Sequence, residues 1–90
     1  MKISNTDLYK NKYDMDTLIQ NINHLDLSII IKTQTLTIPF CADYILNEKY
    51  QILNNEKYID LSDIKKTQPH LNTSDIIQYN VDKIINLINQ

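Results

Sequence analysis

The sequence predicts a small all-α domain built from two tandem helix-turn-helix units about 34 residues apart, plus N- and C-terminal helices. Three observations support this fold class: a ten-residue segment that occurs twice, an apolar stripe of helical period near the C-terminus, and the absence of glycine. Without glycine the Asn-Gly turn of tight β-hairpins is missing, which disfavours a sheet-rich fold. The length and the 42% hydrophobic content fit a single helical domain over residues 1–90, with repeat units at about 25–46 and 59–89.

The repeated segment is the strongest of these observations. Residues 25–34 read LDLSIIIKTQ and residues 59–68 read IDLSDIKKTQ, so seven of ten positions are identical. Matches of Ile or Lys are common in this composition, but a joint match of Asp, Leu, Ser, Thr and Gln in fixed order is not. A repeat of this length indicates one supersecondary unit that is used twice.

The first helix of each unit is predicted over about 27–34 and 61–67. Pro69 forces Gln68 out of the α region, so the second of these helices must end there. Residues that favour a helix N-terminus precede both helices. They are Asp26, Ser28, Asp60 and Ser62.

A second helix follows the turn in each unit. In the first unit it is predicted from about Ile38 to Leu46, with Thr37 as its cap and Pro39 in its first turn, where a missing N–H costs little. In the second unit it is predicted over about 74–89 and is the clearest helix of the chain. Upstream of both units, a further apolar stripe follows Asp14 or Asp16 as cap. Its members are Met15, Leu18, Ile19 and Ile22.

The segment over residues 47–58 contains NEKY twice. We interpret it as the tail of a helix, a loop at Asn54-Asn55 and an extended approach to the second unit.

The last predicted helix carries the candidate protein interface. The interface residues follow the spacing i, i+4, i+7, i+11, and Ile76, Ile85 and Leu87 flank them. This is more apolar surface than one side of a packed helix can hide, so we expect contact with a protein partner or self-association. The interface residues are Ile77, Val81, Ile84 and Ile88.

Gln34 and Gln68 are the polar positions that the repeat singles out. One hypothesis is a ligand or partner contact that is repeated by symmetry. The hypothesis we favour is that each amide satisfies backbone groups at the turn between two helices, where carbonyl and N–H groups lack partners. The sequence therefore predicts two structural turn residues.

Catalytic and metal-binding patterns are not found in the sequence. A glycine-free chain has no Gly-rich phosphate loop and no dinucleotide fingerprint, and we expect neither enzyme activity nor a cofactor. His24 and His70 are dispersed, and Cys41 is the only cysteine, which we interpret as a small core residue; no metal site is expected. Asp26 and Asp60 suit helix capping better than acid–base chemistry.

Charge and hydropathy limit the classes of partner that we expect this protein to bind. The formal charge is −2 and all nine basic residues are lysine, so a nucleic-acid partner is not expected. The polar N-terminal segment has no signal-peptide pattern, and the longest apolar run, Ile29-Ile30-Ile31, is too short for a membrane span. The sequence thus predicts a soluble intracellular protein. Its abundance of Ile, Asn, Lys and Tyr reflects an AT-rich genome.

Residues 30–40 resemble a known kind of short helical repeat, of the pattern I-S-x-Y-Q-x-L-S-x-x-F-I. The second copy departs from it, because Gln68 is followed by Pro69-His70-Leu71 and no Phe follows. Such repeats occur in uncharacterised proteins of giant DNA viruses and some phages, which implies a helical repeat fold and a viral setting. The matching residues are Ile30, Gln34, Leu36, Thr37 and Phe40.

Two functional hypotheses follow from the sequence. The first is a small structural or protein-interaction module, such as a virus-encoded minor virion component or a factor that binds a host protein in its cytoplasm. The alternative is a helix-turn-helix nucleic-acid-binding protein, suggested by the rhythm of residues 61–66, a turn and residues 73–78. The acidic charge, the lack of arginine and Asp75 at the start of the second helix weigh against the alternative.

Overall fold

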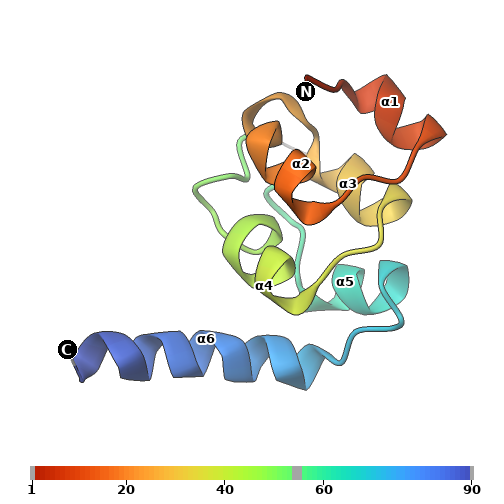
Figure 1. Cartoon of the computed structure of the whole chain (residues 1–90). Coiled ribbons are helices and arrows are strands. Elements are labelled where there is room, and N and C mark those ends of the chain that lie inside the picture. Colours follow the sequence, from red (N-terminus) through yellow and green to blue (C-terminus); the bar gives the residue numbers. More distant parts are fainter. Residues whose placement is uncertain (1, 54–55, 90) are drawn as a thin grey trace.

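The computed structural model describes residues 2–53 and 56–89, and every regular element in these two ranges is a helix or helical turn. The prediction of an all-α fold is confirmed. Short helices form a compact body, and one long helix lies along a side of that body (Figure 1). The elements are α1 (Asn5–Lys10), α2 (Met15–Gln20), the 3-10 turn η1 (Ile22–His24), α3 (Leu27–Thr33), α4 (Ile38–Phe40), the π-helical turn η2 (Cys41–Ile45), α5 (Leu61–Thr67) and α6 (Thr73–Ile88).

Capping side chains fix where most of the helices begin. Asp26 accepts a hydrogen bond from the backbone N–H of Ser28 at the start of α3, and Asp60 accepts from Ser62 and Asp63 at the start of α5. Both helices therefore begin at the residue that the repeat predicts. Since six- or seven-residue helices are marginal alone, their stability comes from packing against one another.

The α4–η2 segment follows the prediction at its start and differs at its end. Thr37 caps α4 and Pro39 lies in its first turn, as predicted. The chain stays helical to Ile45 but widens into a π-helical turn, in which the Leu46 N–H donates to the Cys41 carbonyl. The helix does not extend into the 47–58 segment, and the loop predicted at Asn54-Asn55 lies outside the described residues.

The helix α1 was not predicted. Its segment is polar, and Leu8 is the one apolar side chain of α1 that is buried in the core. Local chemistry nevertheless favours the helix, because Ser4 and Asp7 form a capping box around its first turn. A polar sequence with a single anchor gives no periodic signal, which is why the helix was missed.

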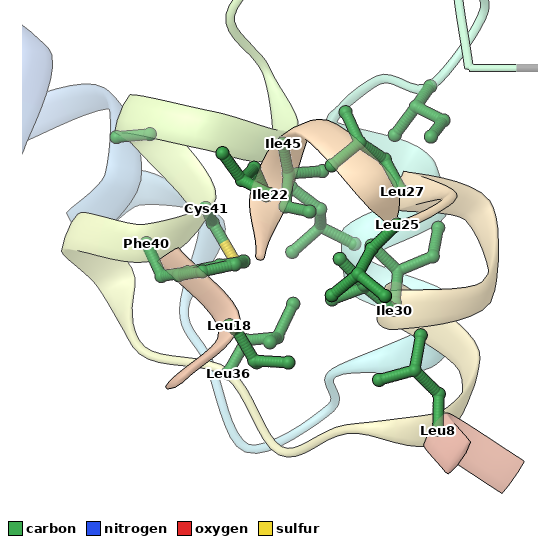
Figure 2. Close-up of a cluster of buried hydrophobic side chains, with 14 of the residues drawn as sticks. Leu8, Leu18, Ile22, Leu25, Leu27, Ile30, Leu36, Phe40, Cys41 and Ile45 are labelled. Atoms are coloured by element: carbon green, nitrogen blue, oxygen red, sulfur yellow. The ribbon is translucent and has the colours of Figure 1, made fainter. Parts of the chain in front are cut away.

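The core draws side chains from every part of the body. Figure 2 shows residues of α1, α2, α3 and η2 pointing toward a common centre, with Leu36 from the turn before α4 among them. Cys41 is fully buried there, as predicted, and burial raises the pKa of its thiol to about 12. The side chains with under 2% exposure include Leu8, Leu18, Leu27, Ile30, Leu36, Ile45, Ile64 and Ile76.

Helix α6 is the longest element, with sixteen residues. Asn72 caps it by accepting from the Ser74 N–H, and its predicted span of about 74–89 agrees with the observed Thr73–Ile88 within one residue. Figure 1 shows its C-terminal half extending beyond the other helices. Among the described residues, neither this helix nor any other combines the length and apolarity that crossing a membrane requires.

Candidate protein-interaction face

Helix α6 attaches to the body through one face. Ile76 is fully buried, and α6 contacts α4, η2 and α5. Farther along, the Tyr79 hydroxyl donates to Asp43 Oδ2 at 2.9 Å, and Lys83 Nζ lies 2.6 Å from Asp43 Oδ1. One apolar anchor and one aspartate therefore hold the helix against the body.

The Asp43 contacts change the pKa values of the two side chains that they hold. Hydrogen bonding to the Asp43 carboxylate raises the pKa of the Tyr79 hydroxyl and the pKa of the Lys83 ammonium group. In both cases the folded protein favours the protonated form. The stabilisation that these two contacts give the folded protein is therefore fully present below the unfolded pKa values, near 10. It is lost as the pH rises through the raised pKa values of the folded protein.

We expect Asp43→Asn to loosen α6 without unfolding the body. Because the pair is partly exposed, the effect is modest, about a two- to fivefold faster amide exchange over residues 73–83. Hydrogen-exchange mass spectrometry measures this, and the variant should also lack the weakening of α6 that we expect in the wild type above pH 10. Asp16→Asn, at an exposed position on α2, is the control. Equal exchange in α6 of both variants and the wild type would contradict a role for Asp43 in holding the helix.

The predicted interface residues lie on a different face of α6. Ile77 is 51% exposed, Val81 41%, Ile84 56% and Ile88 74%. We call these four residues the apolar stripe. Ile85 and Leu87, which flank it, are also exposed, at 47% and 69%. The stripe therefore contributes little to the core of this chain.

The geometry of the helix explains how α6 can be attached to the body while its apolar stripe stays exposed. Successive side chains in an α-helix are about 100° apart, which places the apolar stripe about 140° around the axis from the face formed by Ile76, Tyr79 and Lys83. A mixed face with one buried isoleucine packs on the body. The wider aliphatic face points away from it.

Gln34 and Gln68 are buried, at 3% and 2% exposure, and each amide bonds to backbone groups. Gln34 Oε1 accepts from the Tyr13 N–H at 2.8 Å, and its Nε2 donates to the carbonyls of Leu8 and Asn11, both at 3.0 Å. These backbone groups lie at the end of α1 and in the turn before α2. Gln34 thus joins the end of α3 to the preceding pair of helices, α1 and α2.

Gln68 makes the corresponding set of bonds to the next pair of helices, α3 and α4. Its Oε1 accepts from the Leu36 N–H at 2.9 Å, and its Nε2 donates to the carbonyls of Ile31 at 2.9 Å and Gln34 at 2.7 Å. Each glutamine satisfies backbone groups at a turn between two helices. That turn belongs to the preceding helix pair, not to the pair in which the glutamine itself lies.

Glu56 is a buried polar residue that the sequence reasoning missed. It is 2% exposed, and its Oε2 accepts from the Leu27 N–H at 2.6 Å. Its Oε1 accepts from the N–H groups of Ile52 and Leu53, at 3.0 and 2.7 Å. The carboxylate therefore ties the segment before α5 to the first residue of α3. Its place in the second NEKY gave no signal of this role.

The remaining candidate residues are the two histidines and the two aspartates of the repeat. His24 and His70 are both exposed, and His70 Nε2 lies 2.8 Å from the Leu36 carbonyl. Within the part of the chain that the structure describes, no three His, Cys, Asp or Glu side chains gather closely enough to hold a metal ion. Asp26 caps α3 and Asp60 caps α5, as described above.

Comparison with protein-family models, with curated proteins and with solved structures found no match to this chain. Its function must therefore be inferred from the geometry of α6 and from the way the body holds it.

Proposed function

We propose that this protein is a small protein-interaction module, in which a packed helical body holds α6 so that the apolar stripe faces outward. The observation that carries the proposal is the separation of the two faces of α6. Ile76 and the Asp43 contacts attach the helix, while the apolar stripe lies outside the buried core and is 41–74% exposed. A helix held in this way presents its free face in a fixed direction.

The extent of the free face supports a binding role. The six exposed aliphatic residues of α6 amount together to more than three fully exposed side chains. Contiguous apolar patches larger than a few hundred Å² are rare on proteins that remain alone in water, and they mark interaction sites. Burial of this surface by a partner removes it from water, which is the main driving force of protein association.

Tandem helix-turn-helix units are the architecture that we infer for the body. The three backbone groups bound by Gln68 lie 23 residues after the three bound by Gln34, group by group. A glutamine that reaches back to the preceding pair suits a stack in which each unit contacts its neighbour.

The same pattern supports a third unit at the N-terminal side, in addition to the two predicted from the repeat. In each helix pair the second helix has a capping residue followed four positions later by a fully buried side chain. The three combinations of cap and buried residue are Asp14 with Leu18, Thr37 with Cys41, and Asn72 with Ile76.

The setting we propose is viral. The similarity of residues 30–40 to repeats of giant-virus and phage proteins supports a minor virion component or a factor that binds a host protein. Nucleic-acid binding has less support, because the outward face of α6 is aliphatic and Lys83 is engaged by Asp43.

Affinity purification with matched variants tests the interaction role. We expect tagged wild-type protein, expressed in its native source, to bring down a defined set of proteins that Ile84→Glu does not retain. Asn86→Glu adds the same charge to the opposite side of α6 and should retain them. If the same proteins co-purify with all three forms, or if none does with any and the protein also stays monomeric, the proposed function is wrong.

A further inference from the structure

The spacing of the apolar stripe indicates the kind of surface that covers it. The steps from Ile77 to Val81, Ile84 and Ile88 are four, three and four residues, which is the alternation of a seam between two helices. Gln78, Asn80, Ile85 and Leu87 border this seam on its two sides. The natural occupant of such a seam is another helix with the same spacing.

Charge narrows the occupant further. The charged residues of α6 are Asp75, Asp82 and Lys83, and none of them lies in the seam or at its borders. An acidic or basic partner helix would therefore find no charge to pair with. A second copy of α6 meets no like charge at the seam, and a formal charge of −2 gives weak repulsion between whole molecules.

The exposed area is sufficient for a pair. Six side chains between 41% and 74% exposed on each copy would together bury on the order of 1,000 Å², which is near the lower limit for a specific interface. A contact of this size predicts a reversible dimer.

We propose that the apolar stripe pairs with the same stripe of a second copy of this chain, the two α6 helices running antiparallel. A two-fold axis between Val81 and Ile84 brings Val81 opposite Ile84 of the second copy, and Ile77 opposite Ile88. In an antiparallel pair the two helix dipoles point in opposite directions, which is the favourable arrangement. Isoleucine at both kinds of seam position also disfavours a parallel two-stranded pair. This inference rests on the proposed function and names its partner.

Sedimentation velocity over a range of concentrations tests the pairing. We expect the wild type to change from monomer to dimer in the micromolar range, Ile84→Glu to stay monomeric, and Asn86→Glu to behave as the wild type. Both substituted side chains are exposed, and circular dichroism should show the same helix content in all three forms. A wild type that stays monomeric at about 1 mM, or a dimer that Ile84→Glu does not weaken, overturns the proposal.

Cysteine cross-linking tests the direction. In the antiparallel pair the two copies of residue 88 are about 16 Å apart along the axis, whereas residues 77 and 88 are opposite each other. A mixture of Ile77→Cys and Ile88→Cys should form a mixed disulfide on mild oxidation, and Ile88→Cys alone should not. Efficient cross-linking of Ile88→Cys with itself overturns the antiparallel arrangement. Cys41 does not interfere, because it is fully buried.

The two experiments separate this inference from the proposed function. A strictly monomeric protein that retains other proteins through an intact Ile84 refutes the pairing and leaves the interaction role in place. A monomer that retains none refutes both. A dimer that Ile84→Glu dissociates supports both.

Discussion

Gln68→Glu is expected to lower the free energy of unfolding by about 4 kcal/mol or more, which is most of the stability of a small domain. In the wild type, Gln68 Nε2 donates to the carbonyls of Ile31 and Gln34 at 2.9 and 2.7 Å. The substitution places a carboxylate oxygen against these two acceptors. The charge has no water to solvate it, since the side chain is 2% exposed.

Two further variants make this expectation specific. Gln68→Leu leaves the same backbone groups without partners but adds no charge, so we expect a smaller loss, about 2 kcal/mol. Gln20→Glu makes the same chemical change at an exposed glutamine of α2 and should leave stability within about 0.5 kcal/mol of the wild type. Urea unfolding followed by circular dichroism measures all three. If Gln68→Glu and Gln20→Glu are equally stable, Gln68 does not hold the two helix pairs together.

The parts of the fold that could be predicted are those with local causes. The helices α3 and α5 begin at capping aspartates, and α6 combines a cap with a regular apolar period, so their bounds follow from a few neighbouring residues. The helix α1 has a capping box but a single buried anchor, Leu8, and its stability depends on the distant Gln34. No local pattern expresses that dependence.

The candidate interface shows the same division between local and distant causes. The period places the apolar stripe on one face of α6, but it does not say which face of α6 packs on the body. That choice depends on the contacts that the body offers, among them Asp43, which is 36 residues from Tyr79 and 40 from Lys83. A polar contact between positions this far apart has no signature in a single sequence. The structure supplies the direction in which the stripe points.

Glu56→Ala is expected to cost the second-largest amount of stability, about 3 kcal/mol. The buried carboxylate accepts three backbone hydrogen bonds, and charge-assisted bonds of this kind are stronger than neutral ones. Truncation leaves the Leu27 N–H, at the first residue of α3, without its partner in the interior. The N–H groups of Ile52 and Leu53 are in an exposed segment, and water can replace their partner there.

The three hydrogen bonds of Glu56 differ in how deeply they are buried, so substitutions that remove different numbers of them should lower stability by different amounts. Glu56→Gln keeps a single acceptor oxygen, and we expect it to lose about half as much stability as Glu56→Ala. Glu48→Ala removes an exposed glutamate of the same segment and should change stability little. Amide exchange at Leu27 should accelerate in Glu56→Ala and remain slow in Glu48→Ala. If Leu27 exchanges at the wild-type rate in both, the segment before α5 is held by its apolar contacts, such as buried Ile59, and the carboxylate contributes nothing.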